Sequence, residues 1–137
     1  MGLTVLDAGI LIGLLNPDDV HHASATKALH RAHHDADVLV MPVSAYAEAL
    51  VHPSRRGPDA VGIAEAAIDR IPIRIQALDR TTARSAAMVR AAHRSLKLPD
   101  ALVIATAIEL DADVLLTTDQ RWPSAPDLRF GGRLVTV

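Results

Sequence analysis

The chain opens with the run Leu3-Thr4-Val5-Leu6-Asp7, a β-prone segment that ends in a carboxylate. A second run of this kind, Val114-Leu115-Leu116-Thr117-Thr118, is followed directly by Asp119. In a sheet of parallel strands, the ends of the strands and the starts of the following helices share one edge of the sheet. The two aspartates are therefore predicted to lie at the same edge.

Short apolar runs alternate with helical patterns along the whole chain. Strands are predicted at 3–6, 38–42, 71–78, 114–116 and 134–137, with Pro72 placing the third near an edge of the sheet. Helices are predicted at 10–15, 20–34, 44–51, 59–70, 79–95 and 99–110, with Ser44 as an N-cap, a tight turn at 7–9 and a loop at 52–58. This alternation is typical of an α/β fold. We expect a single domain over residues 1–137, with a parallel sheet of four to five strands between two layers of helices.

Composition excludes several classes of protein. Half of the 137 residues are apolar but only three are aromatic, so the core must consist of Ala, Val, Leu and Ile. The chain has no cysteine, which excludes disulfides and thiolate metal sites. No run approaches the roughly 18 apolar residues of a membrane helix, and the N-terminal residues lack the pattern of a signal peptide. We therefore expect a cytoplasmic protein without a membrane segment; its net charge of −2 indicates no particular partner.

Two further carboxylates are predicted to join Asp7 and Asp119. Glu48 and Asp100 lie in the first turns of predicted helices that are apolar around them. A carboxylate beside such surfaces needs a partner. Taken singly, each acid has a structural explanation, as a helix cap, a turn cap or part of a solvated face. Taken together, four acids at one edge would repel one another unless a divalent cation such as Mg²⁺ or Mn²⁺ bound them.

Four short motifs carry these acids, in order, across essentially the whole chain. They are Leu6-Asp7-Ala8-Gly9-Ile10-Leu11-Ile12, Ser44-Ala45-Tyr46-Ala47-Glu48, Leu98-Pro99-Asp100-Ala101-Leu102 and Leu116-Thr117-Thr118-Asp119. With these motifs the chain resembles the PIN-domain ribonucleases, and among them the VapC toxins of bacterial toxin–antitoxin pairs. The resemblance implies a three-layer α/β/α PIN-like domain and a metal-dependent endoribonuclease, with catalysis and binding of Mg²⁺ or Mn²⁺ assigned to Asp7, Glu48, Asp100 and Asp119.

The resemblance implies further features of the site and of its partners. The hydroxyl of Thr117 would support the metal ligands, and hydrolysis would leave a 5′-phosphate and a 3′-hydroxyl. The substrate would be an RNA such as tRNA or ribosomal RNA. The protein would form a homodimer and be held inactive by a cognate antitoxin, for which the predicted helices at 10–15 and 59–70 offer apolar surface. Many relatives have Thr or Ser after the first aspartate and then a polar residue. This chain has Ala8 and Gly9 instead, which removes a hydroxyl but no ligand.

Other residues were considered for the site. His30 and His34 have the spacing of a zinc pair, but their helix is polar and short of other ligands, so a solvated face is expected. Arg55, Arg56 and Arg121 are candidates for contact with RNA phosphates, although Arg121 could instead pair with an acid. Trp122 follows a buried strand and is expected in the core.

Two other kinds of function are compatible with a small α/β fold. A signalling receiver domain needs paired acids after the first strand and a lysine after a late strand, and neither Lys27 nor Lys97 has that position. A catalytically degenerate PIN-like module that binds RNA or an antitoxin is the remaining alternative. Metal titration separates it from a nuclease, because an intact site binds Mn²⁺ and cleaves RNA.

Overall fold

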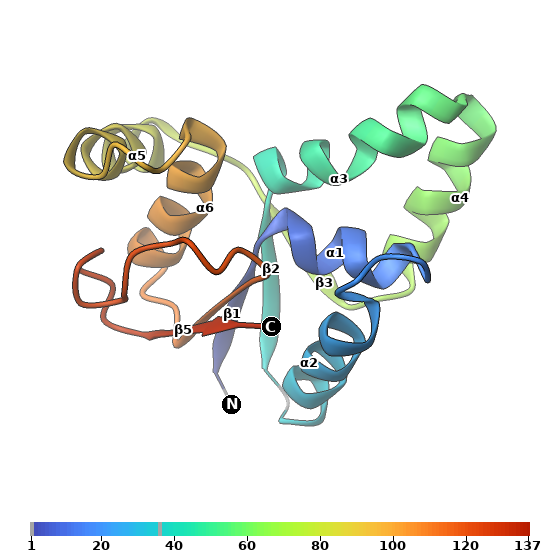
Figure 1. Cartoon of the computed structure of the whole chain (residues 1–137), viewed down its shortest axis with the longest axis horizontal. Helices are drawn as coiled ribbons and strands as arrows, with labels where there is room; N and C mark the ends of the chain where they lie inside the picture. The colour runs from blue at the N-terminus through green and yellow to red at the C-terminus, as the bar shows by residue number, and fades with distance from the viewer. Residues whose placement is uncertain (1, 36) are drawn as a thin grey trace.

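Alternating strands and helices build a five-stranded parallel sheet in this computed structural model, which describes residues 2–35 and 37–137 (Figure 1). The strand order is β3-β2-β1-β4-β5, and every neighbouring pair is parallel. The strands are β1 (Leu3–Leu6), β2 (Val38–Pro42), β3 (Ile73–Gln76), β4 (Val114–Thr117) and β5 (Arg133–Thr136). The helices are α1 (Ala8–Leu15), α2 (His22–His34), α3 (Val43–Arg56), α4 (Pro58–Asp69), α5 (Arg80–Ala92) and α6 (Leu98–Glu109).

The helices form two layers that cover the central strands. The pairs α1–α2 and α5–α6 lie on opposite sides of β1 and β2, and α3 with α4 extends away from the sheet as a helical arm (Figure 1). A parallel sheet covered on both faces needs strands that are apolar on both faces. In β1, β2 and β4 the side chains of Val5, Leu39, Val40 and Leu115 are accordingly buried. The three-layer α/β/α architecture expected from the sequence is confirmed.

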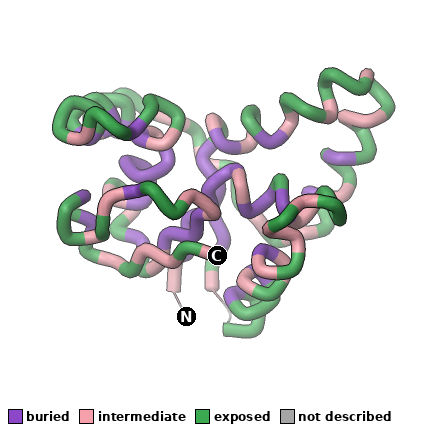
Figure 2. The backbone as a smooth tube through the Cα atoms, viewed as in Figure 1, coloured by how far each residue is buried: buried purple, intermediate pink, exposed green. Residues whose placement is uncertain are grey.

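The core is mainly aliphatic, as the composition requires, and also includes Met41, Trp122 and Phe130. Helix α6 contributes five apolar residues that are at most 1 % exposed: Ala101, Val103, Ile104, Ala105 and Ala107. Figure 2 shows the buried segments gathered where this helix meets the sheet. The apolar face expected on the second helix is also buried, with Ala25, Leu29 and Ala32 of α2 inside. No helix in the described part of the chain combines the length and apolar character that crossing a membrane requires.

Three local predictions from the sequence are wrong. Residues 7–9 do not form a turn, because α1 begins at Ala8 with Asp7 as its N-cap. Ser44 is not an N-cap, since α3 begins one residue earlier. Residues 52–58 are not a loop, because α3 continues through Pro53 to Arg56. Packing of α3 against α4 outweighs the single backbone hydrogen bond that a proline removes. Gly57, at a φ of 113°, ends the helix.

Replacement of Ile104 by alanine tests the position of the core. Ile104 is fully buried, so the change is expected to cost about 2–5 kcal/mol of unfolding free energy in lost contacts and a residual cavity. The matched control is Ile63→Ala on α4, whose side chain is 73 % exposed and should cost less than about 0.5 kcal/mol. Urea unfolding followed by circular dichroism measures both, and equal costs would show that this helix does not form the core.

Candidate metal centre

Asp7 lies at the junction of β1 and α1, where two hydrogen bonds orient its carboxylate. One oxygen accepts the Ala8 N–H at 2.8 Å, which caps α1. The other accepts the hydroxyl of Thr117 at 2.8 Å. The register of β1 with β4 creates this contact, because Leu6 pairs with Leu116 and the next residues on both strands meet at the carboxyl edge of the sheet. Asp7 is 7 % exposed, so its charge is held away from solvent.

Thr117 links Asp7 to the turn that carries Asp119. Its hydroxyl donates to Asp7 and also accepts the Asp119 N–H at 3.0 Å. The Asp119 carboxylate in turn accepts the backbone N–H of Arg121 at 2.9 Å and the Arg121 Nε–H at 3.2 Å. Asp119 is therefore fixed through its backbone by Thr117 and through its side chain by Arg121.

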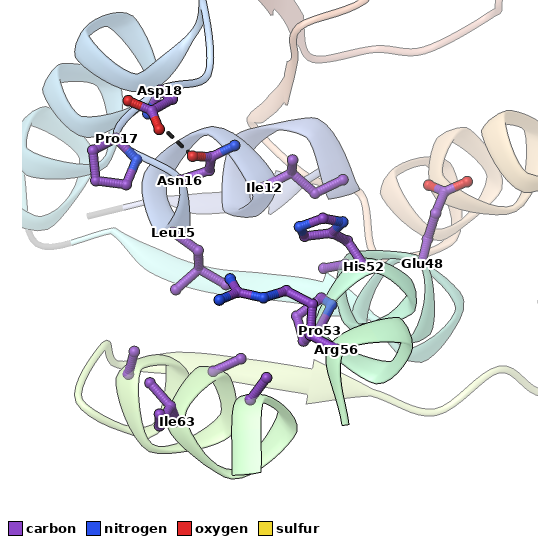
Figure 3. A pocket seen from close by; sticks show the side chains of 14 residues that line it. Ile12, Leu15, Asn16, Pro17, Asp18, Glu48, His52, Pro53, Arg56 and Ile63 are labelled. Atoms are coloured by element: carbon purple, nitrogen blue, oxygen red, sulfur yellow. Dashed lines mark hydrogen bonds between the residues drawn. The ribbon is translucent and has the colours of Figure 1, made fainter. Parts of the chain in front are cut away.

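Glu48 and Asp100 reach the same edge from two helices. Asp100, in the first turn of α6, accepts the Lys97 N–H at 3.3 Å. Glu48 lies on the exposed side of α3, and in Figure 3 its side chain extends from α3 toward α6. Each of these acids raises the pKa of a neighbour, so the two helices bring their charges within electrostatic range.

The electrostatics of the four acids differ with their surroundings. Burial raises the pKa of Asp7 to about 6, and the nearby charges of Asp100 and Glu48 add to this effect against the two hydrogen bonds that lower it. Burial also raises the pKa of Glu48, with the Asp100 charge as the second cause. The pKa of Asp100 is raised by burial and by Asp119, against the hydrogen bond from Lys97. The hydrogen bond from Arg121 lowers the pKa of Asp119.

This arrangement has the chemistry of a site for a hard divalent cation. Carboxylate oxygens are the ligands that Mg²⁺ and Mn²⁺ prefer, and three of the four groups carry charge that their surroundings disfavour. Over residues 2–35 and 37–137, no three acidic or histidine side chains already form a complete ligand set. Asp100 and Asp119 instead accept hydrogen bonds from the Lys97 N–H and from Arg121, and both carboxylates are only partly buried. The residues present thus fit such an ion.

The other predicted residues lie in different surroundings. Arg121 pairs with Asp119, whereas Arg55 and Arg56 lie exposed in the last turn of α3 rather than in a loop. Trp122 is in the core, as expected. His30 and His34 are exposed on α2.

Sequence reasoning missed two hydroxyls near the acids. Ser44 lies one helical turn before Glu48, and its buried Oγ has no hydrogen-bond partner among the described residues. Thr118 lies between Thr117 and Asp119, and its side chain packs against Gly9. The spacing of Ser44 from Glu48 was a usable signal, whereas the contact of Thr118 with Gly9 was not visible in the sequence.

A groove of about 750 Å³ begins beside Glu48 and runs between α1, α3 and α4. Figure 3 shows Ile12 and Leu15 of α1 on one side of it, and His52, Arg56 and Ile63 on the helical arm. Its lining is mainly apolar, and Ile63 is 73 % exposed there. The groove therefore joins an apolar surface to the acidic edge of the sheet.

Comparison with known proteins identifies the family of the chain. The PIN domain model matches residues 4–128, which include all four acids. The chain belongs to the PIN-domain family. No curated protein matches it significantly. Its fold is that of solved toxin structures, although identities of 14–21 % establish the fold alone.

Three of these structures come from different bacteria. VapC20 of Mycobacterium tuberculosis, a Sarcin-Ricin loop cleaving toxin, shares 18 % identity over 86 % of this chain and 91 % of its own, with a TM-score of 0.69. VapBC2 of Rickettsia felis, bound to a DNA fragment from its promoter, shares 14 % over 98 % of both chains, with a TM-score of 0.71. A toxin–antitoxin complex from Klebsiella pneumoniae shares 21 % over 97 % of this chain and 96 % of its own, with a TM-score of 0.70.

Replacement of Asp7 by asparagine is expected to stabilise the metal-free PIN domain at neutral pH. The pKa of Asp7 is about 6 in the folded state against an ordinary 3.8, so the folded state binds more protons between these values. Stability therefore falls as pH rises from about 4 to 6, by up to about 3 kcal/mol, and Asp7→Asn removes this loss.

Urea unfolding in EDTA at pH 4 and pH 7.5 measures the effect. Asp7→Asn should lose less stability between the two pH values than the unaltered protein, whereas Glu109→Gln, at an exposed position on α6, should change nothing. An unchanged pH dependence in Asp7→Asn would contradict the assigned pKa.

Proposed function

We propose that this protein is a metal-dependent endoribonuclease that acts as the toxin of a toxin–antitoxin pair. Membership of the PIN-domain family supports a nuclease, and the fold shared with VapC toxins supports the role as a toxin. The observation that carries the proposal is the buried carboxylate of Asp7, whose pKa is raised to about 6 beside other acids at the edge of the sheet. A buried carboxylate with a raised pKa destabilises the metal-free fold, so its presence favours a functional role such as binding a cation.

The residues have separate roles in this proposal. Asp7, Asp100 and Asp119 would hold Mg²⁺ or Mn²⁺, and Glu48 would contribute directly or through a water molecule. When bound, the ion would polarise the scissile phosphate and favour ionisation of the attacking water. Thr117 holds Asp7 and the Asp119 turn in register through its two hydrogen bonds. Asp7 must be ionised to bind a cation, so affinity should fall below pH 6.

RNA recognition would depend on phosphate contacts more than on stacking. The chain has three aromatic residues, and Trp122 is buried. Arg55, Arg56 and Arg121 are the candidates for phosphate contacts, and release of Asp119 to a cation would free Arg121 for this role. The substrate would be tRNA or ribosomal RNA, and the cleavage of the Sarcin-Ricin loop by VapC20, which has the same fold, supports a nuclease function.

The antitoxin would occupy the groove between α1, α3 and α4. The groove is mainly apolar and includes Glu48 in its lining, so a segment bound in it would lie beside an acid of the proposed site. The structures of toxin–antitoxin complexes with the same fold support such a partner. We also propose that the protein forms a homodimer and acts in the cytoplasm.

RNA cleavage by the purified chain tests the enzymatic function. Discrete cuts in a pool of tRNA and ribosomal RNA are expected with Mg²⁺ or Mn²⁺ and none with EDTA. Asp100→Asn removes an acid of the proposed site and should lower the rate about 100-fold or more, since stabilisation by the ion amounts to several kcal/mol. Glu109→Gln, on the same helix but exposed at its far end, is the matched control.

The possible outcomes separate the nuclease from a binding module. Full metal-dependent cleavage by Asp100→Asn would show that the site is misassigned. Binding of RNA without cleavage in either metal, in protein free of antitoxin, would favour the catalytically degenerate module.

Replacement of Ile63 by aspartate tests the groove. A charge on its apolar wall should weaken capture of the co-expressed antitoxin at least tenfold while cleavage in its absence is retained. Met88→Asp places a charge at a similarly exposed residue on α5, outside the groove, and should not affect capture. Equal capture by both variants, measured by affinity purification and mass spectrometry, would contradict the assignment of the groove.

A further inference from the structure

Gly9 and Thr118 lie in direct contact at the edge of the sheet that carries the acids. A Cβ added to Gly9 would overlap the Thr118 Oγ1 and would lie 3.3 Å from its Cβ and 3.4 Å from its Cγ2. The space next to Gly9 is therefore filled by the side chain of Thr118. Any side chain at position 9 would require Thr118 to move.

The backbone of α1 does not itself require glycine at this position. Among the described residues, Gly57 is the glycine with a positive φ, so Gly9 has a conformation open to any residue. Glycine costs about 1 kcal/mol relative to alanine inside a helix. The close approach of Thr118 is thus the physical reason for a glycine here.

The contact lies between the same two elements that the hydrogen bond from Thr117 to Asp7 connects. Gly9 follows Asp7 by two residues on α1, and Thr118 immediately precedes Asp119 after β4. The hydrogen bond fixes the position of Asp7, and the packing contact fixes the turn that leads to Asp119. Together the two contacts join the start of α1, next to Asp7, to the turn that leads to Asp119.

We propose that Thr118 is a positioning residue that, packed against Gly9, holds Asp119 at the separation from Asp7 at which both bind one divalent cation. This inference rests on the metal site proposed above. The described residues give Thr118 Oγ1 no hydrogen bond, so the shape of the side chain carries the effect. Gly9 and Thr118 are both partly exposed, so their contact is not part of the buried core. A purely structural contact would affect the stability of the fold more than its affinity for a cation.

A double-mutant cycle tests the contact. Mn²⁺ affinity, measured by isothermal titration calorimetry, should fall about tenfold in Gly9→Ala, because the new methyl group forces the Thr118 side chain out of its present packing against α1. Thr118→Ala should weaken affinity a few-fold by loosening the turn. The double variant should bind better than Gly9→Ala, since removing Oγ1 and Cγ2 makes room for the methyl group. Thr118→Val, which keeps the shape without the hydroxyl, should retain affinity.

The outcomes distinguish this inference from the proposed function. Thermal unfolding in EDTA should change little in Thr118→Ala and Thr118→Val. If Gly9→Ala does not fold, the Mn²⁺ affinities of these two variants still show whether the Thr118 side chain acts through its shape. Additive losses in the cycle, or a loss of affinity in Thr118→Val equal to that in Thr118→Ala, would overturn the role of packing. Unchanged affinity in all variants would overturn it while leaving the metal site intact. Absence of Mn²⁺ binding by the unaltered protein would overturn both proposals.

Discussion

The hydroxyl of Thr117 and the N–H of Ala8 hold the Asp7 carboxylate in a nearly water-free position at the end of β1. Two hydrogen bonds do not offset the loss of water around the charge, and the pKa of Asp7 remains raised to about 6. The metal-free fold thus retains an unfavourable buried charge. A cation bound there would stabilise the folded state in proportion to its affinity. The Asp7 carboxylate thus lowers the stability of the metal-free fold and is also the central ligand of the proposed metal site.

Parallel strand pairing explains why the acids could be located from the sequence. Asp7 and Asp119 follow β1 and β4, whereas Glu48 and Asp100 lie toward the N-terminal ends of α3 and α6. A parallel sheet collects such positions at one edge. The alternation of apolar runs and helical patterns was therefore sufficient to predict the fold class. It did not predict the order of the strands in the sheet. Local rules failed where tertiary packing opposed them. Pro53 is accommodated inside α3, and Asp7 begins a helix directly where a turn was expected.

Side-chain geometry accounts for the features that the sequence did not reveal. The pairing of Asp119 with Arg121 depends on rotamers within a turn, although the sequence raised it as an alternative. The contact between Thr118 and Gly9 joins residues 109 positions apart, at a distance that only the register of β1 with β4 determines. The groove beside Glu48 exists because α3 continues past Pro53 and carries α4 away from α1. The contact of Thr118 with Gly9 and the groove depend on long-range contacts, whereas the pairing of Asp119 with Arg121 is local.

Anomalous diffraction from crystals of the protein soaked in Mn²⁺ would show whether these carboxylates bind a metal ion. The expected result is a manganese peak coordinated by Asp7 and Asp100, with the Asp119 carboxylate turned from Arg121 toward the ion. A peak bound elsewhere, or its absence at concentrations that support RNA cleavage, would show that these carboxylates do not form the metal centre.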